Sequence, residues 1–159
     1  MRATRPLGSA QALQERPIVP PDPDPPPASA EQAVLAANRA FYDAFEAADL
    51  DAMSDVWEHS DRVTCVHPGW TVLRGWGAVA ASWVAILGGP QRLQFILTNE
   101  VVVVEHDVAW VTLDENIIGG HPGSTVAALN VFVLGERGWR MVAHHGSVVM
   151  VPAAERRGL

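Results

Sequence analysis

The sequence contains no lysine, and this absence limits the partners that the chain can attract. All eleven basic residues are arginine, and the 18 acidic residues bring the formal net charge to −7 at pH 7. No run of basic residues interrupts this acidic balance, so the surface is unsuited to a phosphate backbone. We therefore expect no nucleic-acid partner.

Cysteine and long apolar runs are scarce as well. Cys65 is the single cysteine, which excludes an internal disulfide and a cysteine-based zinc site. The longest apolar stretches, around Val101–Val104 and Val126–Leu134, have the length of a strand, whereas a membrane helix needs about 20 residues. Arg2 and Arg5 are not followed by the apolar segment of a secretory signal. We expect a cytoplasmic chain with no membrane contact.

Proline is concentrated near the N-terminus. Seven of the 12 prolines lie between Pro17 and Pro27, and proline removes backbone donors and disfavours helix. We interpret residues 1–28 as a disordered tail, with a docking peptide for a proline-recognising partner as the alternative. The length of 159 residues then favours one folded domain, expected at residues 29–151, and a short C-terminal tail at 152–159.

The first part of the expected domain has the pattern of helices. Ser29 and Gln32 make a capping-box pair in front of apolar residues at helical spacing, which predicts a helix to about Ala48. Asp49 can cap a short second helix. A third helix is expected over residues 76–87, because glycine and proline follow it directly.

The rest of the domain is rich in β-branched residues. Strands are expected at 62–67, 93–104, 108–118, 125–134 and 139–149. Turn residues separate the four long strands, which favours an antiparallel sheet and an α+β fold with three N-terminal helices packed on it. Val131 and Phe132 illustrate strands that are apolar on both faces. Because three helices can cover only one face, we expect the other face to form a homodimer.

A series of short motifs follows the same order as these elements. They are Trp57 with Asp61, Val66-His67-Pro68-Gly69-Trp70, Leu73-Arg74-Gly75, Ser82-Trp83, Asn130-Val131-Phe132, Gly138-Trp139-Arg140-Met141-Val142 and His144-His145-Gly146-Ser147. Over roughly residues 30–150 the chain resembles the SnoaL-like branch of the nuclear transport factor 2-like superfamily, also called ketosteroid isomerase homologues.

This resemblance implies a fold but no single activity. It implies a cystatin-like cone, in which a curved sheet wraps a pocket, usually within a homodimer. The superfamily includes isomerases, dehydratases, hydrolases and cyclases, together with members that only bind or assemble, so the function must come from the site. Ala143 and Trp76 depart from the histidine and the basic residue that relatives often carry there.

The ketosteroid isomerase mechanism needs a carboxylate base and a phenol that holds an enolate. When the end of the first helix is aligned by its Ala48-Asp49 turn, the phenol position falls on Phe41 and misses Tyr42, the sole tyrosine. The base position falls near His67. We therefore expect a pocket without a phenol, which disfavours that mechanism.

Two histidines are the candidates for acid/base catalysis, because imidazole titrates near neutral pH. His67 ends the first strand, and its alternative role is packing on the turn that follows. His144 and His145 are neighbours on a strand and point to opposite faces. His145 shares its parity with Met141, so we assign His145 to the pocket and His144 to the other face. The alternative is a hydrogen-bonded structural histidine.

Other residues are candidates for binding. Asn130 interrupts an apolar strand and Ser147 lies on the expected pocket side, so both are expected to orient a carbonyl or hydroxyl. For Asn130, the alternative is a bond to a neighbouring strand. Trp57, Trp70 and Trp83 are expected to wall the pocket. Core packing would explain Trp57 and Trp83, and turn covering would explain Trp70.

One carboxyl group near a strand end is expected to be buried. Asp114 and Glu115 are neighbours near a strand end, so one of them faces inward or towards a dimer partner unless the strand end is simply solvated. Burial would raise the pKa of that carboxyl and allow it to act as an acid or base. No two histidines have the spacing of a zinc site, and we expect neither a metal nor a cofactor.

Together these residues predict a small-molecule-binding protein with an apolar organic ligand. We expect it to isomerise, dehydrate or cyclise that ligand by acid/base catalysis without a cofactor. The alternative is a non-catalytic ligand-binding or dimerisation and assembly module, which the missing phenol and Ala143 favour.

Overall fold

A computed structural model describes residues 28–118 and 125–150. Both expected tails lie almost entirely outside this part of the chain. The elements within it are α1 (Ala30–Ala47), α2 (Leu50–Val56), β1 (Thr64–Val66), β2 (Leu73–Arg74), α3 (Trp76–Leu87), β3 (Gln94–Glu105), β4 (Val108–Ile118), β5 (Thr125–Gly135) and β6 (Gly138–Val148). None of the helices in the described ranges is both long and apolar enough to span a membrane.

The helix ends confirm the capping predictions. Ser29 and Gln32 form both bonds of the capping box at the start of α1. The helix ends where Ala48 takes a left-handed conformation with φ 54°. The Asp49 side chain then accepts a hydrogen bond from the backbone of Ala52, which starts α2. These caps satisfy backbone donors that helix ends otherwise leave unpaired.

The sheet has the strand order β2-β1-β6-β5-β4-β3. The four long strands pair antiparallel, as predicted, and each lies within two residues of its expected bounds. One detail of the prediction was wrong, because β1 pairs parallel to β6. The expectation of three N-terminal helices is confirmed in part: α1 and α2 precede every strand, whereas α3 lies between β2 and β3. The chain that follows α2 runs along the edge of β6 opposite to β5, where the backbone N–H of Glu58 donates to the carbonyl of Met141. β1 then pairs with β6 further along the same edge.

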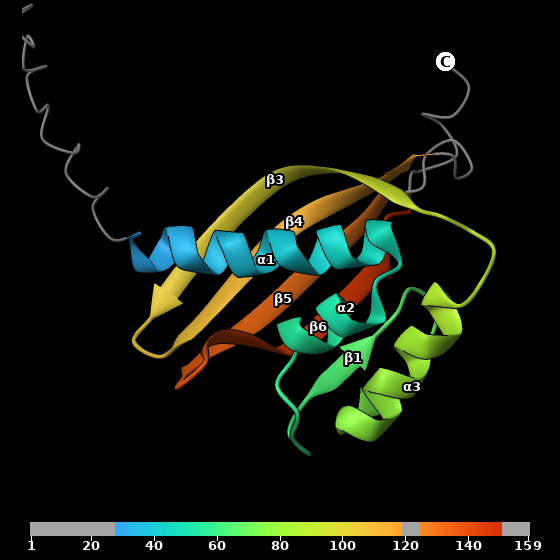
Figure 1. The fold of residues 1–159 in the computed structure, drawn as a ribbon. Coiled ribbons are helices and arrows are strands. Elements are labelled where there is room, and N and C mark those ends of the chain that lie inside the picture. Colours follow the sequence, from blue (N-terminus) through green and yellow to red (C-terminus); the bar gives the residue numbers. More distant parts are fainter. Residues whose placement is uncertain (1–27, 119–124, 151–159) are drawn as a thin grey trace, which may run out of the picture.

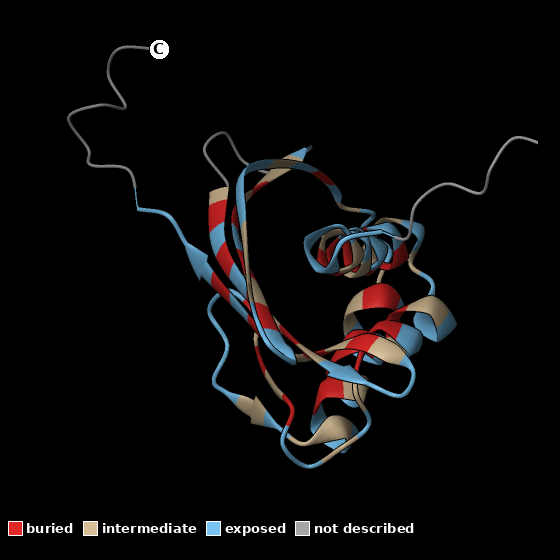
Figure 2. Cartoon of the chain, turned by 90° about the vertical axis from the view of Figure 1, so that its left-hand side faces the viewer, coloured by how far each residue is buried: buried red, intermediate tan, exposed pale blue. Residues whose placement is uncertain are grey.

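The three helices lie on one side of the curved sheet (Figure 1). We call this side the inner face and the opposite side the outer face. Buried residues concentrate where the helices meet the inner face, as Figure 2 shows in red. On β5, Asn130 belongs to the inner face and has no exposed surface, whereas its neighbour Leu129 belongs to the outer face and is 39% exposed.

A β-bulge in β6 changes which side chains reach the inner face. Val131 pairs with Ala143 and Phe132 pairs with Met141, so two residues of β6 oppose one step of β5. A bulge of this kind shifts the alternation of side chains by one residue. Met141 is therefore followed on the inner face by His144, three positions later.

Candidate functional site

A network of buried polar side chains crosses the inner face, and Asn130 is its centre. The Nδ2 of Asn130 donates to Oδ1 of Asn38 at 2.8 Å and to the hydroxyl of Tyr42 at 3.2 Å. Its Oδ1 lies 2.6 Å from Nδ1 of His144. Asn38, which comes from α1, donates in turn to Glu100 on β3 at 2.8 Å. The network thus connects α1 with three strands, and it satisfies polar groups whose burial would otherwise be costly.

Glu115 adds a carboxyl group to this network. The Tyr42 hydroxyl donates to Oε1 of Glu115 over 2.7 Å. Burial raises the pKa of Glu115 from 4.5 to about 7, against a smaller lowering by the Tyr42 hydrogen bond. Burial and the neighbouring Glu115 also hold the pKa of the Tyr42 phenol well above its usual value. Near neutral pH, Glu115 is therefore divided between its acid and its base forms.

Two imidazoles lie in the same interior. His67 contacts Ser82 of α3, with 2.9 Å between Nε2 and Oγ, and the Ser82 hydroxyl donates to the carbonyl of Val79. Burial lowers the pKa of His67 to about 4. Burial, together with the nearby His67 and His145, lowers the pKa of His144 to about 3. Both rings are therefore neutral near pH 7.

Several polar residues of this region keep a small accessible surface. His67, Ser82, Glu115 and His144 each retain 5% exposure, whereas Asn38, Asn130 and Tyr42 retain none. The amides and the phenol are thus shielded from solvent. The polar residues that keep some surface therefore include one carboxyl, one hydroxyl and two imidazoles.

The tryptophans predicted as pocket walls divide into two groups. Trp57 and Trp83 are buried in the core at 2% and 1% exposure, and Trp83 meets His67 edge-on with 4.8 Å between ring centroids. Trp70 is 49% exposed and packs its ring edge-on against His67 at 5.0 Å. The structure therefore brings Trp70 and Trp83 to His67, and their role as walls of a ligand site stays a prediction.

The assignment of the histidine pair to the two faces was wrong. His145 and Ser147 are exposed on the outer face, and His144 is buried on the inner face beside Asn130. The cause is the bulge between Met141 and Ala143, which reverses the parity that a regular strand would have kept. Sequence alternation alone gives no sign of such an inserted residue.

The expected absence of a phenol was also wrong. Phe41 and Tyr42 are both fully buried, because Phe41 packs against Trp83 of α3 and Tyr42 packs against Phe95 of β3. The alignment that selected Phe41 thus overlooked Tyr42, the second interior position. Asn38 was missed as a site residue as well. Its signal was present, since a polar residue stands there in the otherwise apolar stripe of α1.

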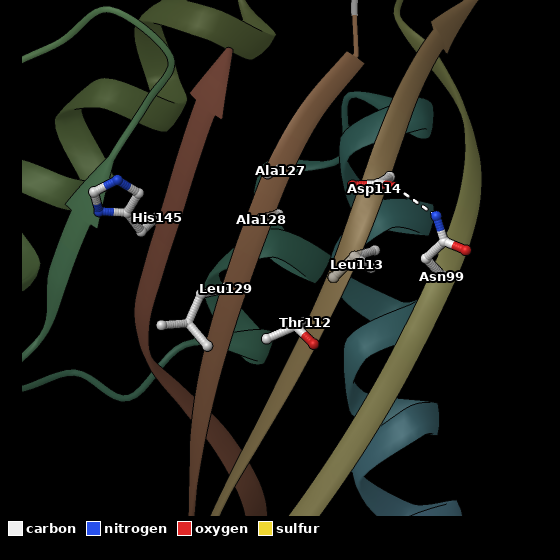
Figure 3. A pocket seen from close by; sticks show the side chains of 8 residues that line it. All are labelled: Asn99, Thr112, Leu113, Asp114, Ala127, Ala128, Leu129 and His145. Carbon is white, nitrogen blue, oxygen red and sulfur yellow. Dashed lines mark hydrogen bonds between the residues drawn. The ribbon is translucent and has the colours of Figure 1, made fainter. Parts of the chain in front are cut away.

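His145 belongs to a hollow on the outer face, with a volume of about 520 Å³. Figure 3 shows that β6, β5, β4 and β3 contribute His145, Leu129, Thr112 and Asn99 to it in turn. The Asn99 side chain donates to Asp114 at 2.7 Å across the rim. This hollow is separated from the interior network by the thickness of the sheet.

The fold and the polar interior define a protein of the nuclear transport factor 2-like class. A family model described as the SnoaL-like domain matches residues 34–152, which is most of the chain. The chain therefore belongs to the SnoaL-like domain family, as its motifs indicated.

Two solved structures resemble the chain in sequence and in fold. One is a proposed dehydratase of the NTF2-like family from Streptomyces avermitilis, with 39% identity, a TM-score of 0.71, and coverage of 76% of this chain and 96% of that one. The other is a proposed calcium/calmodulin-dependent protein kinase type II association domain from Thiobacillus denitrificans. It has 38% identity, a TM-score of 0.67, and coverage of 73% of this chain and 94% of that one.

A curated plant relative is the F-box protein SKIP8 of Arabidopsis thaliana. It is 30% identical over 122 residues, which make up 76% of this chain and 51% of that protein. The chain thus spans about half the length of this relative.

Proposed function

We propose that the chain binds a small, largely apolar organic molecule at the inner face and dehydrates it, with Glu115 as the group that carries the proton. The observation that carries this proposal is a carboxyl with 5% exposure, hydrogen-bonded to a buried phenol, whose pKa is raised to about 7. A group with a pKa near the working pH can both accept and release a proton within one turnover.

The dehydration of a β-hydroxy ketone fits such a group. The Glu115 carboxylate removes a proton from the carbon between the carbonyl and the hydroxyl-bearing carbon. The resulting carboxylic acid then protonates the hydroxyl, the carbon–oxygen bond breaks, and a carbon–carbon double bond and water are formed. Tyr42 donates to Oε1 of Glu115 and so fixes the carboxyl, which leaves Oε2 to carry the proton.

The surroundings favour a neutral substrate. The described residues bury no arginine, so an anionic group would enter this region without a cationic partner. Apolar rings such as Phe41 and Trp83 pack beside the polar groups and are themselves buried in the core. The relative described as a proposed dehydratase is 39% identical to this chain over the region that they share, which makes elimination of water the first reaction to test.

The test uses the aldol adduct of benzaldehyde and acetone, whose dehydration gives the ultraviolet-absorbing enone benzalacetone. We expect turnover by the wild type and a loss of at least about 100-fold in kcat for Glu115→Gln, the usual scale for a general acid–base group. Asp114→Asn is the matched control, because Asp114 is the neighbouring carboxyl with its side chain in the outer hollow. Wild-type activity in Glu115→Gln would refute the assignment.

The same proposal can be tested without choosing a substrate. Native mass spectrometry of protein purified from its own host should reveal a bound small organic molecule. Wild-type protein that carries no such molecule and leaves the adduct intact would contradict a ligand-binding function.

A second candidate function, self-association, is favoured by the outer face. Ile96, Val101 and Leu129 are 55%, 56% and 39% exposed there, although each is apolar. Exposed apolar surface of this kind marks protein contacts, and a second copy is the simplest partner for a sheet face. The relative from Thiobacillus denitrificans is described as an association domain. Size-exclusion chromatography with light scattering should give a dimer at micromolar concentration, and a clean monomer would exclude this interface.

A further inference from the structure

The direction of every hydrogen bond around Asn130 can be derived from the groups at the ends of the network. A carboxylate can only accept, so the Nδ2 of Asn38 must face Glu100 and its Oδ1 must face Asn130. The Tyr42 hydroxyl donates its single proton to Glu115, so its oxygen accepts a hydrogen bond from Nδ2 of Asn130. Two acceptors therefore hold the Nδ2 of Asn130 on one side.

This orientation fixes the tautomer of His144. With Nδ2 of Asn130 engaged by two acceptors, its Oδ1 is the atom that faces His144 at 2.6 Å. An amide oxygen only accepts, so Nδ1 of His144 must carry the proton. The lone pair of the neutral ring then lies on Nε2. Free imidazole side chains prefer the opposite tautomer, so the protein holds His144 in its less common form.

A parallel argument applies to His67. The hydroxyl proton of Ser82 goes to the carbonyl of Val79, so the Ser82 oxygen accepts from Nε2–H of His67. The proton of His67 is thus already engaged, and its lone pair lies on Nδ1, 3.9 Å from the sulfur of Cys65. Neither imidazole has a free N–H to offer to a ligand.

We infer that His144 is a further substrate-contact residue of this site and accepts a hydrogen bond through Nε2, so that the ligand is a neutral molecule carrying a hydroxyl group. This inference rests on the proposed function for the location of the site. The ring of His144 contacts Phe41 and Trp83, with 5.1 Å and 6.4 Å between ring centroids, and both of these rings are buried in the core. His144 itself keeps 5% exposure, and a ligand would reach the ring through that remaining surface. A ligand that offers only acceptors would meet unprotonated nitrogen at this position.

The tautomer is tested directly by long-range proton–nitrogen NMR correlation on the wild type. The expected spectrum at pH 7 shows His144 protonated on Nδ1 and unprotonated on Nε2. Asn130→Ala should release the ring, which then shifts towards the Nε2–H form. Ser82→Ala is the matched control, since it removes the partner of His67 and leaves Asn130 in place. A wild-type His144 protonated on Nε2 would overturn the inference, whether or not Asn130→Ala folds.

The ligand class is tested with β-naphthol and its methyl ether, two flat probes that differ only in the hydroxyl donor. Naphthol should bind about tenfold more tightly than the ether, the effect of one net hydrogen bond, and should move the Nε2 resonance of His144. Equal affinities, no binding, or an unmoved Nε2 resonance would overturn it. If the wild type has the expected tautomer and binds naphthol but does not dehydrate the adduct, that result contradicts the proposed function alone. Glu115-dependent dehydration with the opposite tautomer would count against this inference alone.

Discussion

Each face of the sheet carries exceptions to the usual distribution of side chains. On the inner face, Asn130 and Glu115 are buried where an apolar core is expected. On the outer face, Ile96 and Leu129 are exposed where polar residues are expected. A half-covered antiparallel sheet normally alternates apolar inward and polar outward. Buried polar groups and exposed apolar groups each cost free energy. The exceptions on the two faces therefore point to separate functions, which are chemistry on the inner face and association on the outer face.

The largest effect should come from removing the centre of the inner network. Asn130→Leu leaves Asn38 and His144 without their partner inside the core. Two buried polar groups without partners should lower the free energy of unfolding by about 4 kcal/mol, measured by urea denaturation. Leu129→Asn changes the adjacent residue on the outer face and should cost less than about 1 kcal/mol. Equal losses for the two variants would mean that the faces do not differ in this way.

The second effect concerns the pH dependence that Glu115 gives to stability. Its folded pKa of about 7 lies above the unperturbed value of 4.5, so the folded state binds more protons between these values. Stability should therefore fall as pH rises from 4.5 through 7, by about 3 kcal/mol from this group. Glu115→Gln should remove that part of the slope in thermal or urea unfolding, whereas Asp114→Asn should leave it. An unchanged slope in Glu115→Gln would contradict a buried, raised carboxyl.

The third effect has the opposite sign and comes from His67. Its folded pKa of about 4 lies below the unperturbed 6.5, so the unfolded state binds more protons between them. This contribution is complete above pH 6.5 and is lost as pH falls, by about 2 kcal/mol at pH 5. His67→Gln should make unfolding less sensitive to acid over that interval. His59→Gln, at an exposed histidine, is the control, and equal acid sensitivity in His67→Gln and the wild type would argue against burial of this ring.

The smallest effect on the folding of one subunit belongs to the outer face. Leu129→Lys should change the stability of the monomer by less than about 1 kcal/mol, because the side chain is already 39% exposed. Light scattering should nevertheless show that it dissociates the dimer, since a charge would be buried at the interface. Val84→Lys, at a position 55% exposed on α3, should leave the dimer intact. A dimer that survives Leu129→Lys would move the interface elsewhere.

Much of the fold could be predicted because its signals are local. The capping residues Ser29 and Asp49 and the periodicity of the helices and strands placed most elements correctly. The parallel pairing of β1 with β6 was missed, because the pairing partner of a three-residue strand is decided by tertiary contacts. The sequence pattern near residues 64–66 does not indicate which strand pairs with β1.

The candidate site was predicted less well than the fold. Asn130 and His67 were recognised because each is a polar residue at a position expected to be buried. His144 was assigned to the wrong face, since one inserted residue in β6 reverses every later side chain. Tyr42 was discarded because the alignment gave α1 only one pocket-facing position, whereas its buried arc includes both Phe41 and Tyr42.

The proposed function depends on a carboxyl of the inner face that exchanges protons near neutral pH. The most direct test is a carbon NMR titration of the Glu115 side-chain carboxyl in the wild-type protein, with Glu115→Gln used to assign its resonance. We expect a midpoint of about 7, because burial raises the pKa of Glu115 and the Tyr42 hydrogen bond lowers it by less. A midpoint near 4.5, the unperturbed value, would contradict it.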